Sequence, residues 1–176
     1  MKKIILSSMM IAFGIAAQAQ NVTLNVKLNP IQTLVVNPAQ KTVDLAYHTK
    51  EDYASGVSSG TLEDHLTVFS TGGFAVSVQA SGSELVSTAA GSNGNIAANS
   101  IQIVPFYTES ATDGEVKTVA LSQNNQTILT STFGAVEETI DIEYKGSGAN
   151  AYINNYVASQ SPTVYTTELT YTIVAQ

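Results

Sequence analysis

The sequence predicts an all-β protein, an antiparallel β-sandwich of about nine to eleven short strands. Apolar and polar residues alternate with a period of two along most of the chain, and Gly, Pro, Asn and Asp separate these runs. No amphipathic helix pattern follows residue 19. Alternation leaves one face of each strand polar, which favours antiparallel sheets over a buried parallel sheet. We therefore expect an immunoglobulin-like or Greek-key arrangement.

The first nineteen residues have the three parts of a secretory signal peptide. Met1-Lys2-Lys3 is basic, residues 4–17 are almost entirely apolar, and Ala17-Gln18-Ala19 matches an A-x-A cleavage site. The apolar run is shorter than the roughly 20 residues that span a bilayer. We expect residues 1–19 to be removed, leaving one domain over 20–176 without a membrane span. We expect the exported domain to be extracellular or on a bacterial cell surface, with the periplasm as the alternative.

Directly after the cleavage site, apolar side chains alternate with polar ones at Val22, Leu24, Val26 and Leu28. This apolar comb indicates a strand with one hydrophobic face. It is either the first strand of its own sandwich or a donor strand, residues 21–29, that completes the sheet of a neighbour.

The remaining runs predict the other strands in order. Residues 31–36 and 43–47 are followed by a long connection over 48–63. Residues 66–70 and 74–80 flank Thr71-Gly72-Gly73, which predicts a hairpin. Residues 81–100 indicate an exposed loop with a short strand near 84–86. The later predicted strands are residues 101–107, 116–121, 127–132, 140–144 and 165–173, with a helical turn within 149–158.

Composition narrows the function classes. The chain of 176 residues has 7 Lys+Arg against 14 Asp+Glu, a formal charge of −7 that becomes −9 without Lys2 and Lys3. Its few dispersed lysines argue against nucleic-acid binding. It has no Cys, which excludes disulfides, a thiolate nucleophile and a cysteine-based zinc site.

No set of residues predicts catalysis, a cofactor or a metal. His48 and His65 have no metal-ligand spacing, and Glu63 and Asp64 are expected to cap the entry to the strand at 66–70. An acidic cluster, whose alternation places three acids on one wet strand face, is interpreted as a solvated surface. The cluster consists of Glu137, Glu138, Asp141 and Glu143. We expect the protein not to be an enzyme; glycosidase-type chemistry on these acids is the minor alternative.

Two aromatic-x-aliphatic steps carry a family resemblance. Phe74-Ala75-Val76 follows the glycine turn, and Tyr171-Thr172-Ile173 lies in the last strand. This layout resembles bacterial WxL-type surface domains, and the last strand is similar to that of spore-coat-U-like and fimbrial-subunit β-sandwiches. Both steps lack Trp, and the chain lacks the Cys common in fimbrial subunits. The residues of these two degenerate steps are Phe74, Val76, Tyr171 and Ile173, and we interpret Phe74 and Tyr171 as core aromatics on neighbouring strands.

These observations predict a secreted bacterial structural or adhesive surface protein. It is expected to act as a pilus-like filament subunit assembling by donor-strand exchange with its own copies or with other surface subunits. The alternative is a carbohydrate- or cell-wall-binding module that stacks surface polysaccharide on exposed aromatics. Its candidate residues are Tyr107, Tyr152 and Tyr156.

Overall fold

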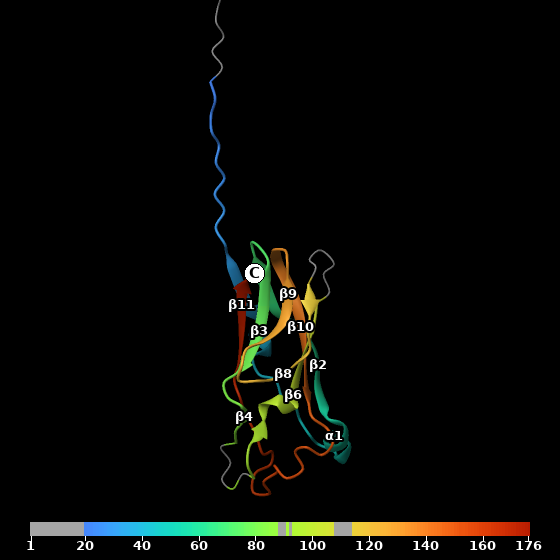
Figure 1. The fold of residues 1–176 in the computed structure, drawn as a ribbon. Coiled ribbons are helices and arrows are strands. Elements are labelled where there is room, and N and C mark those ends of the chain that lie inside the picture. Colours follow the sequence, from blue (N-terminus) through green and yellow to red (C-terminus); the bar gives the residue numbers. More distant parts are fainter. Residues whose placement is uncertain (1–19, 88–90, 92, 108–113) are drawn as a thin grey trace, which may run out of the picture.

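A computed structural model describes residues 20–87, 91, 93–107 and 114–176 and shows a two-layer β-sandwich (Figure 1). All strand pairs are antiparallel, which confirms the predicted all-β fold class. The predicted signal peptide, residues 1–19, lies outside the described residues.

Two main sheets and one small ribbon make up the fold. The first sheet contains, in spatial order, β1 (Gln32–Val36), β2 (Val57–Ser70), β10 (Ala135–Gly146), β6 (Ile101–Phe106) and β8 (Val119–Ala120). The second contains β11 (Leu169–Ala175), β3 (Phe74–Ala80), β9 (Gln126–Ser131) and β7 (Glu115–Val116). The ribbon pairs β4 (Glu84–Leu85) with β5 (Ile96–Ala97). The helices are η1 (Pro38–Gln40), α1 (Lys50–Ser55) and η2 (Ala98–Ser100).

The core lies between the two sheets and is built mainly from central strands. Alternating residues of β2 and β10 meet residues of β3 and β9, and their apolar side chains are fully buried. The fully buried members include Leu66, Val68, Phe74, Val76, Val78, Ile103, Ile128, Leu129, Ile140 and Ile142. A second cluster around Leu121 and Tyr152 closes the end of the sandwich near α1.

The predicted hairpin at the glycine pair is wrong. β2 pairs with β1 and β10, whereas β3 pairs with β11 and β9, so Thr71-Gly72-Gly73 carries the chain from one sheet to the other. The strands β2 and β3 each have a strongly apolar face. Because the two strands lie in opposite sheets, these faces are buried against each other in the core.

Three expectations for the first half are corrected. Residues 43–47 form no strand, although Val43 and Leu45 pack against the core. The expected connection over 48–63 contains α1 and the start of β2. Thr49 and Asp52 form a capping box that starts α1, a signal present in the sequence as T-x-x-D. Glu63 and Asp64 do not cap a strand; they lie within β2, where Asp64 has a positive φ of 52°.

In the second half of the chain, the predicted positions of the strands agree with the structure better than their predicted lengths do. The strand expected at 116–121 is split into β7 and β8, which belong to different sheets. The last strand begins at Leu169, with only an isolated bridge between Thr166 and Val86 before it. In β10 both Ala135 and Ile140 point inward, although strict alternation would place them on opposite faces. The extra residue is taken up by a bulge in which Glu137 has a positive φ of 54°.

Gly56 gives the first testable prediction. Its φ is +88°, it ends α1, and a Cβ there would lie 2.5 Å from the Gly146 carbonyl oxygen. Gly56→Ala is therefore expected to lower the free energy of unfolding by about 1–4 kcal/mol in urea denaturation followed by circular dichroism. Gly72→Ala, where a Cβ meets nothing within 4 Å, is the matched control and should change it by less than about 0.5 kcal/mol. Equal effects of the two substitutions would contradict this account.

Within the described part of the chain, α1 is the one α-helix, and no helix there is long and apolar enough to cross a membrane.

Candidate assembly surface

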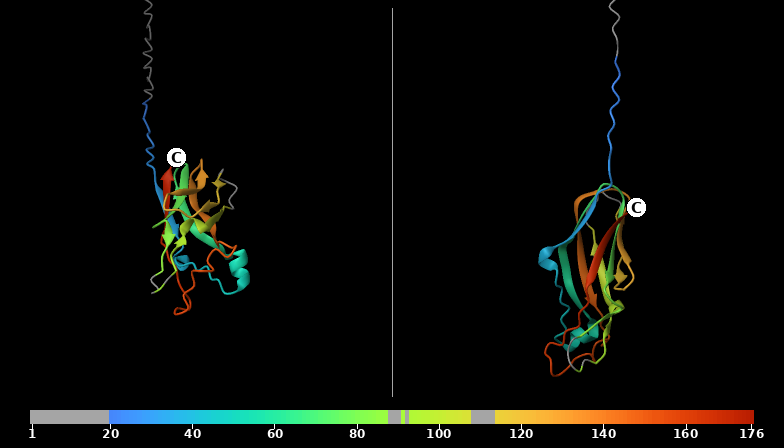
Figure 2. Two further views of the ribbon diagram at one scale, coloured as in Figure 1. Left: turned by 60° about the horizontal axis from the view of Figure 1, so that its bottom comes forward. Right: turned by 90° about the vertical axis from the view of Figure 1, so that its left-hand side faces the viewer.

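Residues 20–30 lie outside the sandwich. They form no strand and project away from one end of the molecule as an extended segment (Figures 1 and 2). The comb residues are among the most exposed large hydrophobics, with exposed fractions of 90% for Val22, 86% for Leu24, 77% for Val26 and 88% for Leu28. Of the two interpretations of this segment, the first strand of its own sandwich is therefore wrong, and the sandwich begins at Ile31.

The comb residues alternate with polar residues as in a half-buried strand, but their side chains are exposed. In a strand, residues i, i+2, i+4 and i+6 point to one face, so all four apolar side chains would lie together. Burying a Val or Leu side chain fully is worth about 1.5–3 kcal/mol. The segment therefore gains free energy by pairing with any edge that offers an apolar groove.

The sandwich has such an edge where β1 and β11 run beside each other. Each is the outermost strand of its sheet on that side, and their Cα atoms approach within 8 Å. Their inward-facing apolar residues pack against the core but stay partly exposed, unlike those of the central strands. These residues are Leu34 and Val36 on β1 and Leu169, Tyr171 and Ile173 on β11.

The outer edge of β11 presents free main-chain groups. The Ser81 N–H donates to the Glu168 carbonyl, and the Gln176 N–H donates to the Gly73 carbonyl, so the main-chain groups of even-numbered residues point toward β3. Because N–H and C=O directions alternate along a strand, the odd-numbered residues from Leu169 to Ala175 present theirs to the outer edge. These same odd-numbered residues carry the inward-facing side chains. An added strand would find hydrogen-bond partners and apolar contacts in one register.

A buried hydrogen-bond chain ties β11 to the opposite sheet. The hydroxyls of Tyr171 and Tyr144 are 2.6 Å apart, and that of Tyr144 lies 2.9 Å from His65 Nε2. His65 Nδ1 lies 2.9 Å from Gln40 Oε1, and Gln40 Nε2 donates to the Glu63 carbonyl. Since Gln40 Oε1 can only accept, His65 donates from Nδ1, accepts from Tyr144, and leaves Tyr144 to accept from Tyr171. The edge strand β11 is thus held in place across the core.

Burial shifts the pKa values of this chain. His65 is 2% exposed, and loss of hydration lowers its pKa below the ordinary value. Burial raises the pKa of Tyr144 to about 12 and raises that of Tyr171 further still. All three side chains are therefore neutral at pH 7, and the donor order of the chain is fixed.

A pH dependence of stability follows from His65. Its folded-state pKa lies below its unfolded value of about 6.5, so between these values the unfolded chain binds more protons. Stability should be full above about pH 6.5 and fall below it, by at most about 1.4 kcal/mol per pH unit. Urea denaturation of the wild type and His65→Gln at pH 7.5, 6.0 and 5.0 tests this. The variant should start less stable and lose less on acidification; parallel losses would show that another group titrates.

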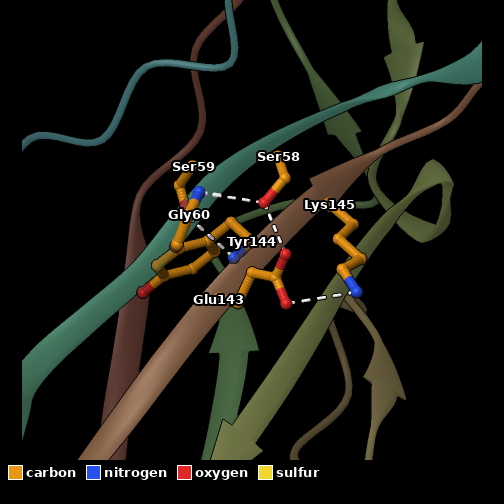
Figure 3. Close-up of polar contacts among 6 residues, drawn as sticks. All are labelled: Ser58, Ser59, Gly60, Glu143, Tyr144 and Lys145. Atoms are coloured by element: carbon orange, nitrogen blue, oxygen red, sulfur yellow. Dashed lines mark hydrogen bonds and ion pairs between the residues drawn. The ribbon is translucent and has the colours of Figure 1, made fainter.

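The acidic cluster is divided among separate structural roles. The Asp141 carboxylate accepts from the Asp64 N–H at 2.8 Å, and Glu138 accepts from the Tyr107 hydroxyl at 2.8 Å. Glu143 accepts from the Ser58 hydroxyl and pairs with Lys145 at 3.1 Å (Figure 3). The Ser58 hydroxyl and Lys145 lower the Glu143 pKa.

The structure bears out part of the expected acidic face. Glu137 is exposed but lies in a bulge, so alternation alone does not fix the direction of its side chain. Asp141 and Glu143 remain on the outer face, next to inward-facing Ile140, Ile142 and Tyr144. Asp141 and Glu143 each accept a hydrogen bond from β2, and Glu138 accepts one from Tyr107.

The three candidate sugar-stacking tyrosines do not share a surface. Tyr152 is buried at 9% exposure, and its hydroxyl donates to Ser100, so its expected exposure is wrong. Its ring packs edge-on against Tyr47 because it fills the core cluster near α1. Tyr107 is half-buried against the main core, at the opposite end of β6. Only Tyr156, at 51% exposure, has the open face that stacking needs.

The two aromatic-x-aliphatic steps lie side by side in the second sheet. Ile173 is opposite Val76, and Tyr171 is opposite Val78, with Phe74 fully buried. Their interpretation as core residues on neighbouring strands is confirmed. The sequence analysis missed the partnership of Tyr171 with His65. In the alternation of Leu66 and Val68, His65 falls at an outward position, and it is buried because the strand is irregular at Asp64, which has a positive φ.

No protein-family model matches the chain, and no curated protein matches it in sequence. Among the described residues, no three His, Asp or Glu side chains are grouped so that they could hold a metal ion. The site with the most specific geometry is therefore the pair formed by the exposed comb and the open edge of β11.

Proposed function

We propose that this chain is an exported bacterial surface protein with a structural, non-enzymatic role, whose copies assemble by donating residues 22–28 to the β11 edge of a neighbour. One observation carries the proposal. A segment with the pattern of a half-buried strand lies outside a sandwich that has an open, partly apolar edge.

The donor and the acceptor match in length and in face. Residues 22–28 and Leu169–Ala175 each contain seven residues, about 23 Å in extended conformation. The donor has four apolar residues on one face, and the acceptor edge has its side chains and its free main-chain groups at the same odd-numbered positions. Main-chain hydrogen bonds supply affinity in strand addition, and alternate side chains supply specificity.

Export and surface placement rest on the signal sequence. The basic start, the apolar run and the A-x-A site support secretion. A domain without Cys and with a low charge content then gains stability from its core and from assembly. Other surface subunits with the same edge are further partners in this proposal.

The carbohydrate-binding alternative gains no support from the tyrosines that suggested it, because Tyr152 is buried and Tyr107 lies at the other end of the sandwich.

The proposal is tested with the mature chain and a variant lacking residues 20–29. We expect elongated assemblies of the mature chain in electron micrographs and a mass above that of the monomer in light scattering. The shortened chain should be monomeric with unchanged circular dichroism. Monodisperse monomers of the mature chain at every concentration, or equal assembly of both chains, would overturn it.

A further inference from the structure

The residue that follows the predicted cleavage site is a glutamine at the free end of the exposed segment. Removal of residues 1–19 at the A-x-A site leaves Gln20 as the first residue, with a free α-amino group. Gln20 is exposed, and residues 20–30 form no helix or strand (Figure 1). Among the described residues, none of residues 20–30 takes part in a hydrogen bond or an ion pair. Nothing in the fold therefore separates the amine of Gln20 from its own side chain.

An N-terminal glutamine carries both a nucleophile and an electrophile. At neutral pH a fraction of α-amino groups is unprotonated. The α-nitrogen attacks the side-chain carbonyl carbon, Cδ, and the new bond between them closes a five-membered lactam ring. The bond from Cδ to the side-chain amide nitrogen breaks, and this nitrogen leaves as ammonia with the proton that the amine gives up. The reaction consumes no oxidant, reductant or other co-reactant.

The reaction is specific for Gln20 and for cleavage directly after Ala19. Every other glutamine of the mature chain has its α-nitrogen in a peptide bond, which is a poor nucleophile. A chain cut one residue later would begin with Asn21, whose shorter side chain would require a strained four-membered ring. The position of the cleavage site thus decides whether the mature chain can cyclise.

We infer that Gln20 is a modification site, at which the exported chain loses ammonia and acquires an N-terminal pyroglutamate. The inference rests on the predicted cleavage after Ala19 and on the exposed, unpaired state of residues 20–30. Cyclisation removes the positive charge of the amine from the end of the segment. Lys27 is then the one cation left in residues 20–31.

The lactam would protect the exposed segment from trimming. Aminopeptidases act on a free α-amino group, and an exposed terminus without partners is an open substrate for proteolysis. Val22 is the third residue of the mature chain and the first residue of the comb, so even short trimming would remove it. A pyroglutamate has no free amine, so that trimming cannot begin. The value of this protection for assembly rests on the proposed function, whereas the modification itself does not.

Mass spectrometry of the exported chain tests the modification. The full chain is expressed with its own signal sequence in an exporting bacterium, and the exported product is kept at neutral pH until its mass is constant. We expect a mass about 17 Da below that calculated for residues 20–176, because ammonia is lost. Fragment spectra should place this loss on Gln20. The matched control is Gln20→Asn, which keeps an exposed amide but would need the four-membered ring, and it should have its full calculated mass.

The possible results separate this inference from strand donation. A chain that begins at Gln20 with its full calculated mass would overturn the inference, and so would a chain that begins at another residue. An equal loss of mass in Gln20→Asn would place the reaction elsewhere and would overturn it too. None of these results bears on strand donation, which depends on the comparison with the chain lacking residues 20–29.

Digestion with an aminopeptidase of broad specificity tests the protection. Gln20→Asn should lose Val22 within a time in which the wild type keeps its full length. Removal of the pyroglutamate with a pyroglutamyl peptidase should make the wild type as sensitive as the variant, which shows that the lactam and not the fold gives the resistance. Equal trimming of the untreated wild type and Gln20→Asn would overturn the protective role.

Discussion

Val26→Asp is expected to abolish assembly while changing the free energy of unfolding of the isolated domain by less than about 0.5 kcal/mol. Val26 is 77% exposed in the single chain, so the substitution removes no packing there. In an assembly the same carboxylate would be buried against the inward-facing residues of β11 without a partner, which costs several kcal/mol and lowers the association constant at least a hundredfold.

Asn25→Asp is the matched control. It introduces the same charge one residue away, on the opposite face of the donor strand, where it remains in water. Sedimentation velocity and electron microscopy of both variants give the comparison, and urea denaturation checks the fold. If Val26→Asp assembled as well as Asn25→Asp, the comb would not be the inserted face.

Phe74→Ala is expected to have the largest effect on folding, a loss of about 3–5 kcal/mol. Phe74 is the largest fully buried side chain of the core and lies on β3, between β11 and β9. Removing its ring leaves a cavity between the sheets at the end of β3 next to Thr71-Gly72-Gly73, and the flanking strands cannot close it without losing their hydrogen bonds.

Phe133→Ala removes the same ring from the loop between β9 and β10, where the side chain is 55% exposed. That change should cost less than about 1 kcal/mol. Denaturation with urea, followed by circular dichroism because the chain has no Trp, measures both variants. Similar losses would mean that burial of the Phe74 ring does not stabilise the core as expected.

The alternation of residues predicted the fold class and most strand positions, because a period of two records which side of a strand is buried. It did not predict which strands pair. Phe69 and Phe74 are five residues apart yet belong to different sheets, and nothing in the local pattern distinguishes a hairpin from a crossing between layers.

In the candidate site too, local alternation could not predict the strand pairing of the donor segment. Val22 and Leu24 have the pattern of any first strand, so the sequence left two interpretations open. Which interpretation holds depends on whether residues 22–28 pair with a strand of their own sandwich, and that is a property of the whole fold. Tyr152 was misplaced for a related reason, since a Gly- and Asn-rich neighbourhood indicates a loop but not that the loop folds back over the core.

The crossing at Thr71-Gly72-Gly73 also bears on how fast the protein reaches its folded state. Because β2 and β3 do not pair with each other, β3 is completed by β11, and Phe74 pairs with Ala175, 101 positions later in the chain. β2 likewise pairs with β10, where Thr61 is opposite Glu143. Pairings this distant must close long loops first, so folding should take milliseconds to seconds. During that interval the edges of β2 and β3 that β10 and β11 later cover would remain unpaired.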